Sequence, residues 1–335
     1  MTRSLWKDPF FLTGFLYLAV LILASFSYYL IWDNEIRSLY FITKEDGSMA
    51  GAPLPPTWSY PFGTDALGLD MLGKILIGAK YTILAAIVIA ALRVAISLPI
   101  GFIIAIYLKP FKRSINGVID SFHYIPLAIL AYYFLHPILW MPFEGFSTSL
   151  YERLAIEVLI LTLLIVPILS SLLGNEMAKI HREEFILSAT VLGAGKFRIM
   201  VKHILPLMKD KLVLIFGQQI QQTLILFIHL GLLTLFLGGT FVDYSIVPDP
   251  PSSVTLEWSG LIGDSFRFLY TAPWIPLTPI LFFASVILAV SLMMEGYVRA
   301  TSGYSYYKKR FKDRYESAKL KETSLHKSDF KRMDV

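Results

Sequence analysis

Residues Glu183–Pro206 read EEFILSATVLGAGKFRIMVKHILP, a polar segment between two long apolar runs, Leu154–Asn175 and Leu212–Val242. A plain connecting loop would need neither helical stretches nor a pair of glycines. Each flanking run is long enough to cross the roughly 30 Å hydrocarbon core of a bilayer as a helix, which takes about 20 residues. The segment therefore indicates a structured connection between two membrane spans.

The segment itself predicts two short helices joined by a turn. Glu183–Leu192 has the apolar spacing of a helix. Gly193 and Gly195 allow a tight turn that a side chain would block. Lys196–Leu205 predicts a second helix, which Pro206 ends because proline lacks the amide donor that a helix interior needs. A rigid helix–turn–helix indicates insertion into a cleft of a soluble partner, and the alternative is a basic loop that only determines topology.

The whole chain has the composition of an integral membrane protein. Of its 335 residues, 55% are hydrophobic and 16% are charged, whereas soluble domains have about 25% charged residues. The absence of cysteine excludes disulfides and cysteine-ligated metal sites. Six runs have the length and apolar character of a span: Pro9–Trp32, Tyr81–Leu108, Ser121–Phe143, Leu154–Asn175, Leu212–Val242 and Phe268–Met294. We expect an all-α, polytopic membrane protein with six transmembrane helices.

Lys and Arg residues determine the expected orientation, since cytoplasmic segments carry an excess of them. With the N-terminus inside, the inner segments hold 23 of the 30 basic residues, the outer segments hold six, and Arg93 lies in the second span. Both termini and the 175–211 loop are then cytoplasmic, and this placement explains the pI of about 9.1 without a nucleic acid partner. The basic residues Lys196, Arg198 and Lys202 of the loop would face lipid headgroups or an acidic partner. The expected parts are an N-terminal span (1–32), an outer loop with an amphipathic helix (33–80), a core with five spans (81–303) and a basic tail (304–335).

The opening segment resembles the EAA loop of ABC importer permeases. That loop has two small residues, a Gly four positions after the second, and a Leu-Pro whose proline lies thirteen positions after the Gly. Ser188, Ala189, Gly193 and Leu205–Pro206 match these positions, and Leu187 stands where a Glu is common. The resemblance implies that the ATPase-coupling residues are Leu187, Ser188, Ala189, Gly193, Ala194, Gly195 and Pro206.

Four further stretches, in the same order along the chain, resemble one branch of these permeases: the second, C-type subunit of peptide/nickel importers. PFGTDALGLD at 61–70 resembles an outer motif before span two, and its residues Gly63, Thr64, Asp65, Gly68 and Asp70 carry the match. Asp120 with Pro126 resembles the start of span three, and LFLGG at 235–239 resembles the end of span five. EWSGLIGDS, APW and EGYVRAT within 257–301 resemble the family's ending. The departures are Leu69, Leu187 and Leu235, which replace Arg, Glu and Ser.

This resemblance implies the type I ABC importer permease fold and an ATP-driven importer that moves peptides by alternating access. The chain has no GxxxxGK[ST] phosphate loop, so we expect it not to be an enzyme and to bind no cofactor. ATP and Mg would bind to two partner ATP-binding subunits. The other implied partners, at the cell membrane of a prokaryote, are a second homologous permease in a heterodimer and an extracellular solute-binding protein. Nickel or another small solute is an alternative cargo, and an ion-coupled secondary transporter is an alternative class.

Two sets of polar residues lie within the predicted spans. Gln218, Gln222, Ile225 and His229 share one face of the fifth span. Polar groups in hydrocarbon are costly, so this face must meet protein or a water-filled path. It either lines a path and bonds a peptide backbone, or it holds the two permeases together. Arg93 in the second span is a further path candidate.

Arg93 and the two outer aspartates each allow two readings. An intramembrane charge indicates a functional site, with Glu157 as one candidate partner. The alternative is that Arg93 extends along its helix to the membrane interface. Asp65 and Asp70 flank glycines, which suits turn and helix-cap chemistry, and contact with an external binding protein is the alternative. No close spacing of His and carboxylate residues predicts a metal site.

Overall fold

The computed structural model describes residues 5–43, 49–108, 117, 119, 121 and 124–301. Asp120 and the tail 304–335 lie outside these residues. The described helices are α2 (Pro9–Trp32), α3 (Met71–Ile106), α5 (Leu127–Leu139), α6 (Leu150–Leu163), α7 (Val166–Ile180), α8 (Glu184–Val191), α9 (Lys196–Ile199), α10 (Leu205–Leu232), α11 (Trp258–Ser265) and α12 (Trp274–Thr301). Two short antiparallel pairs join β1 (Phe41–Thr43) to β2 (Met49–Gly51) and β3 (Thr240–Phe241) to β4 (Ser252–Ser253). The all-α prediction is confirmed apart from these pairs.

Four helices in the described residues are long and apolar enough to span a membrane: α2, α3, the continuous Lys196–Leu232 helix and α12. α6 and α7 together form a fifth candidate span, bent by 43°. The predicted count of six is not confirmed, because α5, in the predicted third span, has 13 residues. At 1.5 Å per residue α5 is about 20 Å long, shorter than the roughly 30 Å hydrocarbon core.

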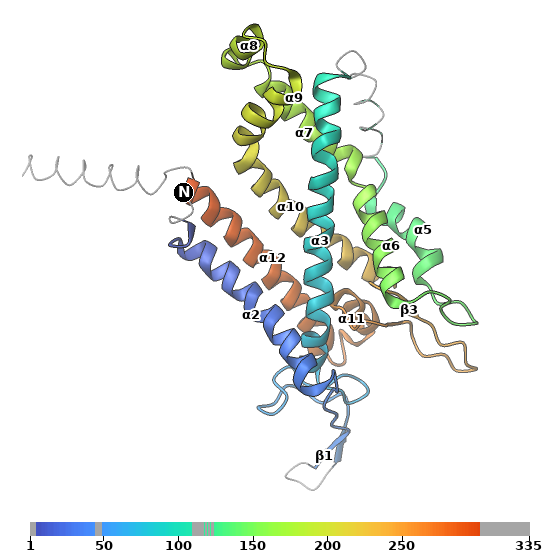
Figure 1. Cartoon of the computed structure of the whole chain (residues 1–335). Helices are drawn as coiled ribbons and strands as arrows, with labels where there is room; N and C mark the ends of the chain where they lie inside the picture. Colours follow the sequence, from blue (N-terminus) through green and yellow to red (C-terminus); the bar gives the residue numbers. More distant parts are fainter. Residues whose placement is uncertain are drawn as a thin grey trace, which may run out of the picture.

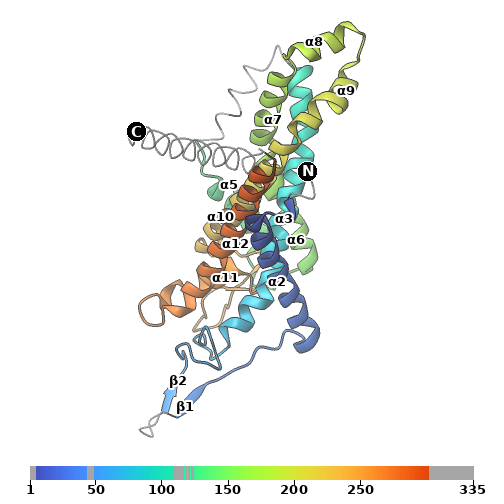
Figure 2. The ribbon, with the colours of Figure 1, turned by 90° about the vertical axis from the view of Figure 1, so that its left-hand side faces the viewer.

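α3 is a single helix of 36 residues. The sequence predicted an amphipathic outer helix followed by a span from Tyr81, and the two form one continuous helix. Asp70 is the N-cap of α3, since its side chain accepts a hydrogen bond from Leu72 N (3.0 Å). Figures 1 and 2 show α8 at one end of the molecule and the β1–β2 pair at the other, with α3 running between them.

Glycines let neighbouring spans approach closely. α2 lies along α12 (Figure 1), and a Cβ atom on Gly296 would lie 2.5 Å from Phe11 N. α3 packs along α7, where a Cβ atom on Gly174 would lie 2.9 Å from Gly101 O. Close approach matters here because lipid tails are as apolar as the side chains, so van der Waals packing holds the spans together.

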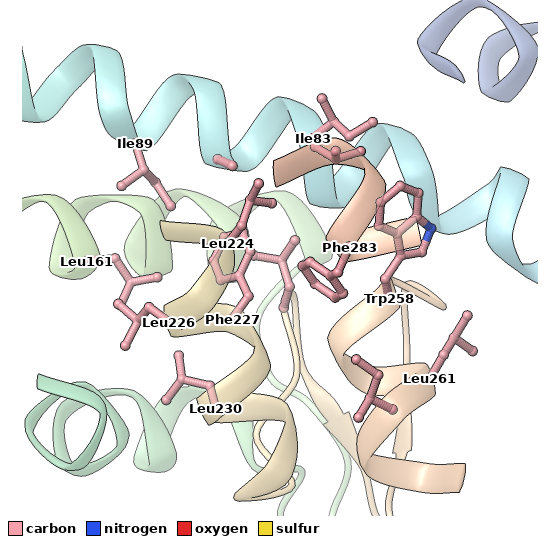
Figure 3. Packing of buried hydrophobic residues seen from close by; sticks show 14 of the residues in the cluster. Ile83, Ile89, Leu161, Leu224, Leu226, Phe227, Leu230, Trp258, Leu261 and Phe283 are labelled. Carbon is pink, nitrogen blue, oxygen red and sulfur yellow. The ribbon is translucent and has the colours of Figure 1, made fainter. Parts of the chain in front are cut away.

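The main core lies where α3, α6, α10, α11 and α12 meet (Figure 3). Its labelled side chains are Ile83, Ile89, Leu161, Leu224, Leu226, Phe227, Leu230, Trp258, Leu261 and Phe283. Trp258 is fully buried, and its Nε1 donates to Ile75 O (2.9 Å), so its polar atom is satisfied. This packing holds α10 against α3 and α6.

Pro167 breaks the predicted fourth span into α6 and α7. Proline has no amide hydrogen, and its ring clashes with the carbonyl four residues back, here that of Leu163. At the break, Ile165 N donates to Thr162 O (3.2 Å), whereas in an α-helix it would donate to Leu161 O. The carbonyl of Leu161 therefore needs another donor.

Candidate functional site

A protruding elbow lies at the end of the molecule where α7 and α9 meet (Figures 1 and 2). We define the elbow as residues 183–204, which form α8, a turn, α9 and the π-helical turn Met200–Ile204. Gly193 in the turn has a φ of +86°, a left-handed conformation that glycine adopts without strain. Gly195 has a φ of −67°, which any residue adopts. The structure thus favours glycine at position 193 and not at position 195.

The second helix of the elbow does not end at Pro206, so that part of the sequence interpretation is wrong. α9, the π-helical turn and α10 form one helix over Lys196–Leu232. Pro206 lies in the first turn of α10, directly after the π-helical turn. The wider π-helical turn lets the helix accommodate a residue without an amide hydrogen. The elbow is therefore continuous with α10.

The inner face of the elbow is anchored by a second cluster of buried side chains. Ile186, Ile199 and Ile204 pack there with Leu173 and Met177 of α7. All five are at most 1% exposed. The elbow is therefore tied to α7 by packing and to α10 by a continuous helix.

The outer face of the elbow is apolar and exposed. Val191, Leu192 and Phe197 are 87%, 88% and 72% exposed. Among the predicted coupling residues, those that are exposed are Leu187, Ser188, Gly193, Gly195 and Pro206, and those that are half-buried are Ala189 and Ala194. Apolar side chains gathered at such exposure mark a surface that contacts another protein or the membrane.

A groove lies between the start of α5, the α6–α7 break and the second half of α10. Its volume is about 690 Å³. Three of the predicted path residues, Gln222, Ile225 and His229, line it. Gln218 is exposed one turn earlier on α10 but does not line the groove. The structure therefore brings three of the four α10 candidates onto one concave surface.

Arg93 is fully buried and does not line the groove. Its Nε and Nη2 donate to Leu161 O (3.1 and 2.8 Å), the carbonyl that lost its helical donor at the break. Its Nη1 donates to Thr223 Oγ1 (2.9 Å) and, at 3.4 Å, to Gln219 Oε1. The planar guanidinium thus bonds α6 and α10 from its position on α3.

Two sequence-based readings of Arg93 are wrong. Its side chain does not extend to the membrane interface, because its guanidinium is buried against a carbonyl of another span. It does not pair with Glu157, whose Oε2 instead accepts a hydrogen bond from Gly238 N (2.9 Å). Sequence reasoning also missed Thr223 as a partner. The available signal was the position of Thr223, which lies four residues after Gln219 and therefore on the same face of the helix.

The outer motif at 61–70 folds as a tight turn that leads into α3. Gly63 and Gly68 have φ values of +71° and +76°, so both positions favour glycine. Asp65 Oδ1 accepts two backbone amides of the turn, and Asp65 Oδ2 pairs with Lys74. This is turn chemistry of the kind that aspartate provides.

The polar atoms of this motif are hydrogen-bonded within the chain. Thr64 O accepts a bond from Trp274 Nε1 (3.1 Å). Asp70 accepts a bond from Arg37 Nη2 (2.7 Å), and this bond raises the pKa of Arg37 above its ordinary value. Asp65 and Asp70 are 6% and 2% exposed, so their direct role is to form the turn and cap α3.

Segments far apart in the sequence also meet beside the first half of α3. The carboxylate of Glu257 is fully buried and caps α11 through the backbone amides of Ser259 and Gly260 (2.8 and 2.6 Å). Burial raises the pKa of Glu257 above its ordinary value. Leu237 N also donates to Glu257, at 3.4 Å. The LFLGG and EWSG segments are therefore parts of one buried scaffold.

The chain matches the protein family described as "Binding-protein-dependent transport system inner membrane component" over residues 97–302. This range is more than half of the chain. It contains the elbow, the walls of the groove and α12.

Several relatives are permeases. The peptide transport system permease protein SapC of Escherichia coli O6:H1 is 26% identical over 253 residues, which are 74% of this chain and 77% of that protein. The dipeptide transport system permease protein DppC of Haemophilus influenzae is 27% identical over 252 residues, 72% and 76% of the two chains. The glutathione transport system permease protein GsiD of Shigella dysenteriae serotype 1 is 23% identical over 241 residues, 72% and 71%.

The fold resembles a chain of the inward-facing MetNI methionine ABC transporter. The TM-score is 0.50 at 17% sequence identity, and the match covers 69% of this chain and 97% of that one. At this identity the likeness concerns the fold, and it confirms the predicted importer permease fold. Together with the family match over the elbow and the groove, it identifies the chain as a multi-pass membrane protein of the binding-protein-dependent transport system inner membrane component family.

Proposed function

We propose that this chain is the permease subunit of an ATP-driven importer that carries peptides across a prokaryotic cell membrane. It pairs with a second, related permease to enclose one path. Each permease docks an ATPase through its elbow, and an extracellular solute-binding protein delivers the cargo. ATP and Mg bind to the ATPase subunits. Both termini and the elbow lie in the cytoplasm, in agreement with the distribution of Lys and Arg.

The observation that carries this proposal is the direct connection between elbow and groove. α7 runs from the break at Pro167 to the elbow, and the Lys196–Leu232 helix runs from the elbow back to the groove. Lys196 and Gln222 are about 39 Å apart along that helix at 1.5 Å per residue. A displacement of the elbow by an ATPase therefore moves two walls of the groove together.

The exposed side of the elbow suits docking by packing. Val191, Leu192 and Phe197 offer apolar side chains that a partner would bury. The small side chains of Ser188 and Ala189 let the partner's backbone approach α8 closely. ATP must act from a separate subunit, since this sequence has no phosphate-binding loop motif.

The relatives favour peptides as cargo. SapC and DppC are named for peptide and dipeptide transport, and GsiD for glutathione, which is itself a tripeptide. The groove offers hydrogen-bonding groups on Gln222 and His229 among apolar neighbours. Such groups can bond the amides of a peptide backbone.

Substitution of Gly193 tests the coupling role of the elbow. Gly193→Val puts a β-branched residue at a φ of +86°, which strains the turn and redirects α8. In proteoliposomes with the complete importer, we expect uptake to fall by about tenfold, the effect of about 1.4 kcal/mol of lost coupling. ATP hydrolysis and membrane insertion should persist.

Gly195→Val is the matched control. A Cβ atom at either glycine would have no atom within 4 Å, but Gly195 has an ordinary φ of −67°. Its valine variant should transport like the unmodified protein. Normal transport by Gly193→Val would contradict the coupling role.

Single cysteines test the orientation, because the chain has none of its own. Ser188→Cys on the elbow should react with a membrane-impermeant maleimide only after cells are permeabilised. Ser59→Cys in the outer loop should react in intact cells. The opposite pattern would exclude docking of a cytoplasmic ATPase on the elbow.

A further inference from the structure

The side chains that line the groove are mostly apolar. Its lining residues include Leu127 and Ala128 at the start of α5, Ile165 and Ile168 at the break, and Ile225 on α10. Among the described residues that line it, Gln222 and His229 carry the polar side chains, and none is Asp, Glu, Lys or Arg. The groove is thus an apolar surface with two hydrogen-bonding side chains.

The adjoining surface has the same character. A neighbouring hollow shares Leu127, Ile165 and Ile168 with the groove and continues along Ile125 and Leu130. The described residues that line it are all apolar. Apolar side chains therefore continue along the start of α5, beyond the groove itself.

Arg93, a charged residue that bonds the groove helix α10, is directed away from the groove. Arg93 bonds α10 through Thr223, on the helix that carries the groove residues, but its guanidinium is fully buried in the core. Two more of its N–H groups donate to Leu161 O. A charged side chain in the groove would lose its hydration and gain no opposite charge from these lining residues.

We propose that the part of the cargo lying against this subunit is a peptide segment with apolar, uncharged side chains, bonded through its backbone by Gln222 and His229. This inference rests on the proposed function and adds the chemical class of the cargo segment. The volume of about 690 Å³ is on the order of twenty times that of one water in the liquid. The groove therefore has room for several apolar side chains.

The test changes the charge of the groove at a position that tolerates substitution. Ile225 is 44% exposed, so Ile225→Asp adds a carboxylate to the groove without opening the core. Ile225→Asn is the control, since it has a similar shape and polarity without the charge. Uptake of the tripeptides Ala-Leu-Ala and Ala-Lys-Ala is measured in proteoliposomes with the complete importer and ATP. The solute-binding protein and the peptide termini are the same throughout, so a change in the uptake ratio reports the groove.

We expect the ratio of lysine to leucine peptide uptake to rise with Ile225→Asp, relative to Ile225→Asn, on the order of tenfold. Both variants should lower uptake of the leucine peptide. An equal ratio in the two variants, with ATP-driven peptide uptake intact, would overturn this inference and leave the proposed function standing. If the unmodified importer takes up neither peptide although its ATPase responds to another solute, the proposed function fails and the inference fails with it.

Discussion

Replacement of Arg93 by leucine should destabilise the protein through the broken fourth span. Arg93 supplies the Leu161 carbonyl with two hydrogen bonds at 3.1 and 2.8 Å, and bonds Thr223 at 2.9 Å. Arg93→Leu removes these donors and keeps an apolar side chain in the core. The carbonyl would then be buried without a donor, because Ile165 N, its donor in a regular α-helix, donates to Thr162 O at the break.

The magnitude follows from two opposing effects. Bonds from a charged donor contribute about 1.5–3 kcal/mol each in soluble proteins and less between membrane helices. Burying the guanidinium costs several kcal/mol, which leucine avoids. Because the lost hydrogen bonds and the avoided burial of the guanidinium largely cancel, the net cost is that of leaving the Leu161 carbonyl without a hydrogen-bond donor, about 1–3 kcal/mol. We expect a loss of about 2 kcal/mol.

Thermal unfolding of the purified protein in detergent, followed by circular dichroism, measures this loss. A loss of about 2 kcal/mol in a chain of this size corresponds to a fall in Tm of about 3 °C. Arg93→Lys should be intermediate, because an ammonium cannot reproduce the planar fork. Thr223→Val is the control that removes one partner and leaves the Leu161 carbonyl bonded, at a cost of about 1 kcal/mol or less.

Equal stability of Arg93→Leu and the unmodified protein would refute the argument. So would a larger loss for Thr223→Val than for Arg93→Leu. Either result would mean that the carbonyl at the break finds another donor, and that Arg93 does not hold α6 to α10.

Three further predictions concern the contacts between α2 and α12 and the outer loops. Gly296→Leu should overpack the contact of α12 with α2, where even a Cβ would lie 2.5 Å from a backbone nitrogen, and should lower the unfolding free energy by about 1–3 kcal/mol. Trp274→Phe removes the bond to Thr64 O and should cost about 1 kcal/mol in the same assay, leaving the ring packing in place. Hydrogen bonds from the amide of Asp249 and from Ser245 lower the pKa of Asp243 below its ordinary value. These bonds therefore stabilise the loop fully when the pH is above the pKa of Asp243 in the unfolded chain, about 4. The stabilisation is lost as the pH falls through the lower pKa of Asp243 in the folded protein. Protection of the Asp249 amide in hydrogen exchange should therefore fall at acid pH, and Asp243→Asn should abolish that dependence.

Hydropathy predicted where α2, α3, α10 and α12 lie, because a bilayer requires long apolar stretches in helical form. It did not predict the bend at Pro167, since the run Leu154–Asn175 is long and predominantly apolar, with Glu157 as its one charged residue. Nor did it predict that α5 is short. Average hydropathy carries no information on where a proline interrupts the backbone or where a neighbouring helix supplies the missing donor.

The candidate site was predictable to the extent that it depends on local backbone. The turn at Gly193 is predictable because a left-handed φ favours glycine. The cap at Asp70 is predictable because its side chain bonds a backbone amide only two residues away. The role of Arg93 depends on a carbonyl in another helix, which no side-chain pattern marks. Similarly, the helical spacing of Gln218 and Gln222 placed both on one face but could not show where the groove ends.

The length of α3 has a consequence for the lipid around the protein. Its 36 residues measure about 54 Å at 1.5 Å each, whereas the hydrocarbon layer is about 30 Å thick. Its N-terminal end is held by the Asp70 cap, and its C-terminal end by Ala105 and Ile106 in the buried cluster near the elbow. A helix that is fixed at both ends adapts to a thinner or thicker bilayer by changing its tilt. Because α3 contacts α2, α7 and α10, a change in its tilt also moves these helices. We therefore expect the rate of uptake to depend on the acyl-chain length of the surrounding phospholipid.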